Sequence, residues 1–255
     1  MISGLVWMLW LSVATAAEPE ARVGTLNVRG LPWPLAQRRA VRLAEVSRWL
    51  KDGGFAVVGL QEVWRGARSL LASDRVHFPE GRKDSGIAVY TPHPLVEPLT
   101  LVPFAAQRGV DALKAKGLVR GVIEVPQLGR LTLGIVHLQA GSGPRNAEVR
   151  GQQLDEALAA LGPGACLLMG DFNVYGSEAL DDASLARLAD AGFVEVVQVE
   201  PHRGTSVYGK ARFDRLFVRE GPVTRFVSTR ARVLRHVSAS DHYPVTARLR
   251  RRAPR

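Results

Sequence analysis

The chain has 255 residues, of which 46% are hydrophobic and 23% are charged. This balance describes a globular protein rather than a disordered or membrane-spanning one. Lysine and arginine number 34 against 24 acidic residues, a formal net charge of +10, which favours polyanions or anionic surfaces such as nucleic acid and phospholipid. Genome base composition can also produce an arginine excess, so charge alone does not select a ligand. The single cysteine, Cys166, excludes an internal disulfide.

Residues 1–17 are typical of an export signal, because an uncharged apolar run precedes small residues at positions 14–17. No lysine or arginine precedes the apolar run, so an uncleaved membrane anchor is the alternative. We therefore predict an exported protein, periplasmic or secreted, whose catalytic domain spans residues 22–250. Residues 251–255 are expected to form a basic tail.

The part between these ends alternates short apolar runs with a few helical patterns. In chain order the pattern predicts a strand at 22–28, a helix at 37–51, strands at 55–60, 86–90, 117–125 and 130–138, a helix at 148–161, a strand at 165–170, a helix at 184–191, and strands at 193–199, 213–218 and 245–249. No internal repeat and no linker divides the chain. The prediction is a mixed α/β domain with two packed sheets flanked by helices.

Polar side chains recur at the ends of these predicted strands. They are Asn27, Glu62, His137, Asp171 with Asn173, Asp214, and the pair Asp241-His242. Each one alone has a structural explanation, as a turn residue, a cap or a surface ion pair. Strand ends at one edge of packed sheets can instead converge on one pocket. A carboxylate, an amide and an imidazole together suit water attack on a phosphate ester.

The motifs Leu60-Gln61-Glu62-Val63, Gly170-Asp171-Phe172-Asn173 and Ser240-Asp241-His242-Tyr243-Pro244-Val245 resemble the endonuclease/exonuclease/phosphatase superfamily. Leu26-Asn27, Ser85–Val89, Val136-His137-Leu138 and Phe213–Leu216 are similar to its other motifs. The resemblance covers nearly all of residues 22–250. It implies a four-layered α/β sandwich with two central, mainly antiparallel sheets.

The resemblance also implies a divalent cation, Mg²⁺ or Mn²⁺. Glu62, helped by Asn27, would bind it through hard oxygen ligands. Asp241 would complete the acidic network on the metal side.

The catalytic roles implied by the resemblance fall to five residues. Asp171 would orient or deprotonate the attacking water, and Asn173 would support this water or the phosphorane oxygens. His137 and His242 would stabilise the transition state from opposite sides as imidazolium donors. Asp214 would hold His242, although Arg215, which follows it in place of the family's usual aromatic residue, is a competing partner.

The substrate class is narrowed by the middle of the chain. Segments 116–122 and 134–140, with Arg150-x-x-Gln153-Leu154, resemble the neutral sphingomyelinase branch. Arg29 stands where abasic-site endonucleases place an acid, which argues against the DNA-repair branch. The sequence shows no long apolar hairpin of the kind that haemolytic sphingomyelinases use to enter membranes.

Two sets of residues are candidates for substrate contact. Lys116 is expected to contact the phosphodiester, and Trp33, Trp64 or Phe104 the lipid. The alternative makes Lys116 a solvated charge and these aromatic residues part of the core.

Four functions therefore stay open at this point. A sphingomyelinase-like phosphodiesterase is favoured, with peripheral contact to an anionic membrane and no obligatory protein partner. A non-specific endonuclease acting on nucleic acid is the rival, since a charge of +10 attracts phosphate backbones. A phosphomonoesterase and a non-catalytic anion-binding protein are the other two.

Overall fold

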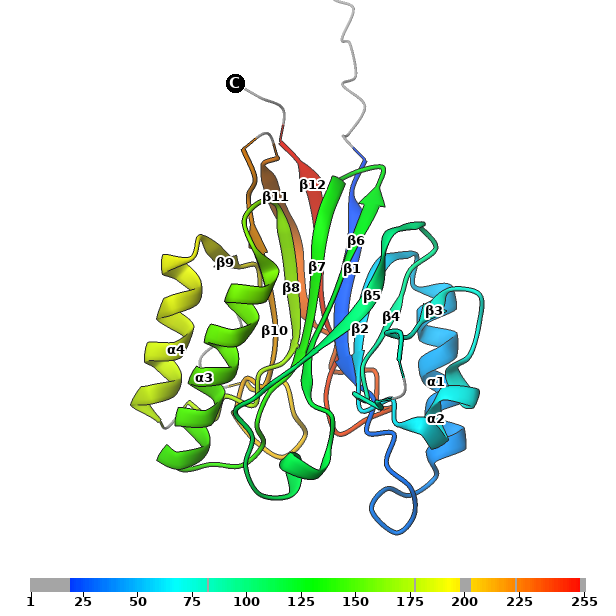
Figure 1. The fold of residues 1–255 in the computed structure, drawn as a ribbon. Helices are drawn as coiled ribbons and strands as arrows, with labels where there is room; N and C mark the ends of the chain where they lie inside the picture. Colours follow the sequence, from blue (N-terminus) through cyan, green and yellow to red (C-terminus); the bar gives the residue numbers. More distant parts are fainter. Residues whose placement is uncertain (1–18, 82, 177, 198–202, 223, 253–255) are drawn as a thin grey trace, which may run out of the picture.

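The computed structural model describes residues 19–81, 83–176, 178–197, 203–222 and 224–252. Two six-stranded sheets pack face to face, with helices on both outer faces (Figure 1). The predicted α/β sandwich is confirmed. The predicted signal at 1–17 lies outside the described residues. No helix within the described part of the chain is long and apolar enough to cross a membrane.

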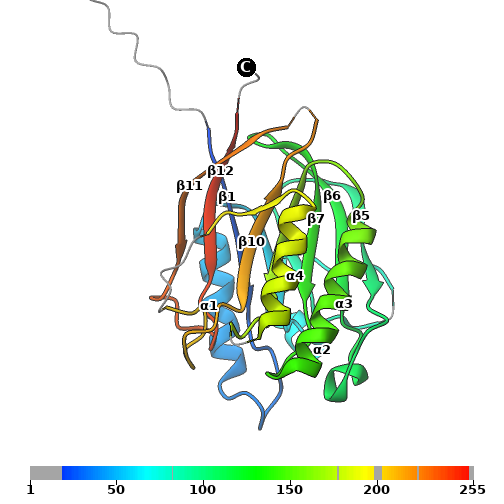
Figure 2. The same cartoon turned by 90° about the vertical axis from the view of Figure 1, so that its left-hand side faces the viewer.

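The first sheet consists, in spatial order, of β11 (Phe226–Val233), β12 (Val245–Arg251), β1 (Ala21–Asn27), β2 (Phe55–Gln61), β4 (Ala88–Tyr90) and β3 (Val76–His77). The second consists of β5 (Leu95–Pro103), β6 (Gly117–Val125), β7 (Gly129–His137), β8 (Cys166–Asp171), β10 (Asp214–Arg219) and β9 (Phe193–Glu195). Helices α1 (Arg39–Asp52) and α2 (Arg65–Leu71) lie on the first sheet, and α3 (Pro144–Leu161) and α4 (Ala179–Asp190) on the second (Figure 1, Figure 2). A short 3₁₀ helix, η1 (Gly109–Leu113), precedes β6.

The main core lies between the two sheets. Val23 and Val57 of the first sheet and Ile135 and Met169 of the second belong to one buried apolar cluster. The backbone N–H of Gly59 donates to the Met169 sulfur at 3.2 Å, so the sheets touch directly at this point. Burial of this apolar surface is the main force that holds the sheets together.

The strand register brings the polar strand ends to one edge. β1 runs parallel to β2 with Asn27 opposite Gln61, and β7 runs parallel to β8 with His137 opposite Asp171. β10 is antiparallel to β8 and begins with Asp214 opposite Asp171. Parallel strands end at the same edge, and an antiparallel neighbour begins there. Both sheets therefore deliver their polar residues to a single edge, called the catalytic edge below.

Edge strands account for most of the elements that the sequence did not predict. β5 and β11 lie at the margins of their sheets, and exposed and partly buried residues alternate along much of both. Because only one of their faces is buried, these strands lack the continuous apolar run of a central strand. The short helix α2 was missed as well.

Other predicted boundaries move by several residues. Helix α3 begins at Pro144 rather than 148, and α4 begins at Ala179 rather than 184. The strand predicted at 193–199 ends at Glu195, and its last two residues lie outside the described part.

The first two residues of the predicted basic tail at 251–255 are paired with the rest of the domain. Arg251 is the last residue of β12, and its N–H donates to Gln127 O at 3.2 Å. Arg252 N–H donates to Arg225 O at 2.9 Å. Backbone pairing therefore continues past the last apolar residue of the strand, and residues 253–255 lie outside the description.

A substitution at Gly170 tests the close approach of β7 and β8 just before Asp171. Its φ is +145°, and an added Cβ would lie 2.0 Å from Val136 O. We expect Gly170→Ala to lower the free energy of unfolding by at least about 2 kcal/mol in urea denaturation. Gly164→Ala is the matched control, because Gly164 also has a positive φ, +102°, but open space around it. Equal losses in the two variants would refute a steric role for Gly170.

Candidate active site

An amide at the end of β1 joins carboxylates from both sheets. Asn27 Nδ2 donates to Glu62 Oε1 at 3.1 Å and to Asp171 Oδ2 at 3.0 Å. Asn27 Oδ1 accepts the backbone N–H of Arg29 at 2.9 Å, which fixes the orientation of the amide. Glu62 follows β2 with φ +58°, a left-handed conformation that a glutamate rarely adopts. Such strain is typical of residues held in place for function.

Asp171 ends β8 and is buried among donors. Its Oδ1 accepts the backbone N–H of Asn173 at 2.9 Å, and its Oδ2 lies 3.7 Å from His137 Nε2. Asn173 has φ +50° and donates through Nδ2 to Leu138 O at 3.1 Å. The sequence prediction that Asp171 and Asn173 lie together is therefore matched by the geometry, and His137 joins them from the neighbouring strand.

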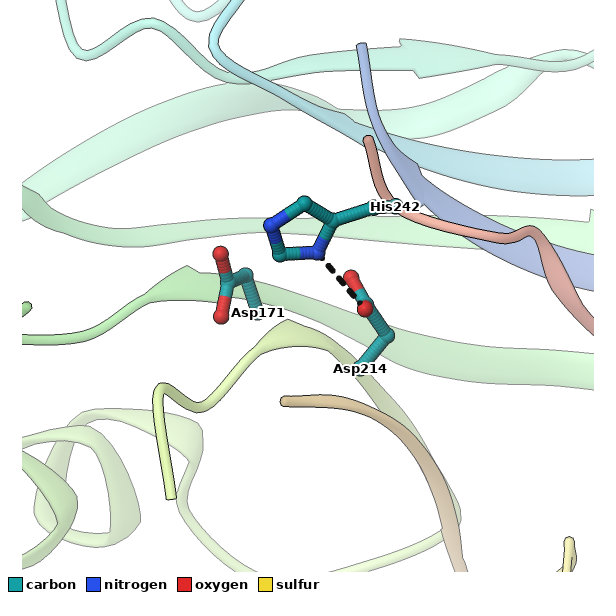
Figure 3. A group of neighbouring side chains, drawn as sticks. All are labelled: Asp171, Asp214 and His242. Atoms are coloured by element: carbon teal, nitrogen blue, oxygen red, sulfur yellow. Dashed lines mark hydrogen bonds and ion pairs between the residues drawn. The ribbon is translucent and has the colours of Figure 1, made fainter. Parts of the chain in front are cut away.

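His242 lies between two carboxylates (Figure 3). Its Nδ1 donates to Asp214 Oδ2 at 2.8 Å, while the other side of the ring faces Asp171. Arg215 does not compete for Asp214, because it pairs with Glu195 at 3.0 Å. The expected Asp214–His242 partnership is present, and the competing pairing is wrong.

The two histidines differ in charge. Burial by itself lowers the pKa of His242, but the carboxylates of Asp214, Asp171 and Asp241 outweigh it and raise that pKa to about 10. Burial, followed by the charges of two lysines and His242, lowers the pKa of His137 well below its usual value. Near neutral pH His242 is thus an imidazolium and His137 a neutral imidazole. The sequence predicts that His137 and His242 both act as imidazolium donors. The directions of their pKa shifts agree with this for His242 and disagree for His137.

The buried carboxylates are more basic than usual. Burial raises the pKa of Glu62 and of Asp171, and neighbouring carboxylates add to both shifts. Donors such as Asn27 and His242 oppose the rise without cancelling it. A carboxylate with a raised pKa accepts a proton from water more readily.

The residues on the Glu62 side fit a divalent cation. Glu62 Oε2 is buried and has no hydrogen-bond partner among the described residues. A buried carboxylate oxygen without a donor is a ligand of the kind that Mg²⁺ or Mn²⁺ binds. Ligand atoms of Asp171, Asp214 and His242 also lie within 4.8 Å of one another. There the imidazolium already supplies the positive charge, so Glu62 is the better candidate.

Asp241 is held by a different partner from the one expected. Its Oδ2 pairs with Arg29 Nη1 at 2.9 Å, and its Oδ1 accepts from Ser240 Oγ at 3.2 Å. The Ser240 hydroxyl also lies 2.6 Å from Asn27 O, where it ties this loop to β1. Asp241 therefore acts on the site by its charge and by fixing Arg29, and a metal contact by Asp241 stays a prediction.

Lys116 lies behind the site instead of lining it. The side chain is fully buried, and Nζ donates to Asp111 Oδ2 and to Leu138 O, each at 2.7 Å. This burial contradicts both direct contact with a phosphodiester and the alternative of a solvated charge. Lys114 is the more exposed lysine, and it lies 5.3 Å from the centre of the Trp64 ring. Its charge opposes the rise in the pKa of Glu62 that burial causes, and adds to the lowering of the pKa of His137 by burial.

Sequence reasoning assigned no structural role to the residues that support the loop after His137. Asp111 Oδ2 also accepts Ala140 N–H at 2.8 Å. Arg150 is fully buried, pairs with Asp181 at 2.7 Å, and donates to Gln139 O at 3.0 Å. A lysine at the start of a buried strand needs a carboxylate within reach. The acid five residues before Lys116 was the available signal.

A cavity of about 570 Å³ opens beside Asp241. It lies between the start of α1 and the loops that carry Val207 and Ser240. Arg29 and Arg42 contribute positive charge to its wall, and Leu35, Val41 and Val207 contribute apolar surface. The site is therefore bordered by a cavity that is cationic on one part and apolar on another.

The sequence pattern of the Endonuclease/Exonuclease/phosphatase family matches residues 24–242. The chain belongs to this family. The resemblance inferred from the motifs is thus confirmed, and the chain is a phosphoesterase by family. Strand-end acids, an amide and an imidazolium form the candidate site of this family member.

A putative neutral sphingomyelinase from Caenorhabditis elegans is 34% identical over 33% of this chain. The match covers 22% of that relative, well under half of its length. Among solved structures, sphingomyelinase C from Streptomyces griseocarneus has a TM-score of 0.68 at 22% identity, over 90% of this chain and 99% of that one. A humanized TDP2 from D. rerio has a TM-score of 0.70 at 20% identity, over 90% and 98% of the two chains. These structures share the fold.

The charge of His242 gives a prediction that needs no substrate. We expect its ring to titrate near pH 10, measured by the pH dependence of its ¹⁵N NMR shifts. Asp214→Asn should move the titration toward the ordinary value of about 6.5. The folded-state pKa is raised, so the pair stabilises the fold fully below about pH 6.5, and this contribution is lost as the pH rises to about 10. A ring that titrates near 6.5 in the unmodified protein would refute the assignment.

Proposed function

We propose that this family member is a divalent-metal-dependent phosphodiesterase that hydrolyses a lipid phosphodiester of the sphingomyelin type. The observation that carries the proposal is the buried imidazolium of His242 held between Asp214 and Asp171. Such a fixed donor stabilises charge that develops on a phosphorane. The similarity to a neutral sphingomyelinase and to the fold of sphingomyelinase C supports the lipid class.

The chain's own residues account for the proton and charge transfers. Asp171, whose pKa is raised by burial, accepts a proton from the attacking water, and Asn173 orients that water. His242 donates a hydrogen bond to a phosphorane oxygen as the negative charge grows, and when the phosphorus–oxygen ester bond breaks, the departing oxygen takes a proton from solvent. His137, neutral and next to Asp171, donates from its own side of the site. Glu62 would bind a cation that, when present, polarises a phosphate oxygen.

The location and partners of the enzyme are part of the same proposal. The apolar run at 1–17 supports export to the periplasm or the extracellular space, or retention there by an uncleaved anchor. A positive net charge supports peripheral contact with anionic membranes. Purified protein assayed against sphingomyelin, lysophospholipid, plasmid DNA and inositol phosphates tests the substrate class.

Metal dependence is tested at Glu62. We expect Glu62→Gln to weaken Mn²⁺ binding, followed by electron paramagnetic resonance, and to lower hydrolysis by about 10²-fold or more, because the variant loses an anionic ligand. Glu97→Gln is the control, since Glu97 pairs with Arg130 on the surface. Full activity in excess chelator would refute a metal-dependent reaction.

The salt dependence of substrate affinity distinguishes a lipid phosphodiesterase from the alternative function, a nuclease. A nuclease that tracks phosphates releases counterions on binding, so its affinity falls steeply as salt rises. An enzyme that takes one headgroup diester makes few ionic contacts, and we expect a shallow dependence of KM on salt when the substrate is presented in zwitterionic micelles. Plasmid nicking that equals lipid hydrolysis at the same enzyme concentration, and is lost in Asp171→Ala, would favour the nuclease.

A further inference from the structure

The most exposed large apolar side chains of the described residues gather at the catalytic edge. Leu113 is 86% exposed, Trp33 81%, Val110 74% and Tyr208 73%. In a soluble domain, single exposed apolar residues are ordinary, but a concentration of them around one site marks an interaction surface.

The strand register places all three segments that carry them at this edge. Trp33 lies in the segment that follows β1, the strand that ends at Asn27, and Arg29 belongs to the same segment. Val110 and Leu113 form part of η1, which leads into β6, and β6 begins beside the end of β7. Tyr208 lies in the segment before Asp214, the first residue of β10. Both ribbon views show η1 and the segment between β1 and α1 at the same end of the molecule (Figure 1, Figure 2).

Hydrogen bonds and charge connect these segments to the candidate site residues. Arg29 donates to the Tyr208 hydroxyl at 2.8 Å and pairs with Asp241 at 2.9 Å. Lys114 directly follows η1, and its charge acts on Glu62. The surface formed by Trp33, Val110, Leu113 and Tyr208, called the apolar rim below, therefore lies at the edge that carries the site.

The charge of the same segments is positive. Residues 28–42 contain four arginines and no acid. Residues 203–213 contain Arg203, Lys210 and Arg212 and no acid, and residues 104–114 add a net charge of +1. Apolar side chains interleaved with cations complement an anionic bilayer, whose headgroups attract the cations while its interface takes up the apolar groups.

We propose that the apolar rim docks the catalytic edge onto an anionic phospholipid surface, so that the enzyme takes its substrate from the membrane. The inference rests on the proposed lipid phosphodiesterase function. Trp33 and Tyr208 suit the headgroup level, where an aromatic ring with a polar group is favoured. Val110 and Leu113 are aliphatic and cannot stack on bases, which favours lipid over single-stranded nucleic acid as the occupant.

Site-directed fluorescence tests which residues meet the lipid. Single variants Trp33→Cys, Leu113→Cys and Val194→Cys of the full chain would carry an environment-sensitive dye. The native Cys166 is buried, and burial raises its pKa to about 12, so it resists labelling. Val194 is the matched control, because it is 64% exposed on β9 at a distance from the catalytic edge.

The dye at Trp33 and Leu113 should shift to shorter wavelength with phosphatidylcholine vesicles that contain phosphatidylglycerol, and less with phosphatidylcholine alone. The dye at Val194 should not respond. Equal responses at all three positions, or responses to a single-stranded oligonucleotide but not to vesicles, would overturn the proposal.

A second measurement separates docking from catalysis. The triple variant Trp33→Ser, Val110→Ser, Leu113→Ser should lower vesicle partitioning by about a hundredfold, while hydrolysis of bis(p-nitrophenyl) phosphate in solution stays unchanged. Unchanged vesicle partitioning in a variant with an unaltered circular dichroism melt would overturn docking. If the unmodified protein binds vesicles through the rim but hydrolyses no diester, the proposed function fails and docking stands.

Discussion

The hydrogen bond from Asn27 Nδ2 to Asp171 Oδ2 joins the two sheets at the point where their polar strand ends meet. It links residues 144 positions apart in the chain and depends on the apolar core that sets the distance between the sheets. The same amide also holds Glu62, so one side chain positions the candidate metal ligand against the candidate general base. The other site residues are arranged around this bond, because Asp171 is the strand partner of both His137 and Asp214.

Burial makes the charges of the site interdependent. In water, two aspartates and a histidine would titrate independently near their ordinary values. Between the sheets, burial raises the pKa of Asp171, while the surrounding carboxylates raise the pKa of His242 to about 10. Lys116 contributes from behind, since its buried ammonium lowers the pKa of His137 without reaching solvent. The result is one fixed cation, one neutral imidazole and a basic carboxylate within a small volume.

The catalytic edge combines this charged interior with an apolar exterior. Loops at a sheet edge are free to carry side chains that the core does not need. In this chain those loops place Trp33 and Leu113 in solvent around a site whose own residues are almost wholly buried. In the proposed function, chemistry and access to a lipid interface fall to different residues, the first to strand ends and the second to the segments that connect the strands.

Local sequence patterns were enough to identify the central strands, the family and the polar residues at the strand ends, because apolar runs and short motifs are local properties. It did not determine the edge strands β5 and β11, whose exposed faces carry no continuous apolar run. The packing of distant segments shows that Asp214 binds His242 while Arg215 binds Glu195, and that Lys116 is buried on Asp111. Partner choice and burial depend on which distant segments pack together, and pKa values follow from that packing.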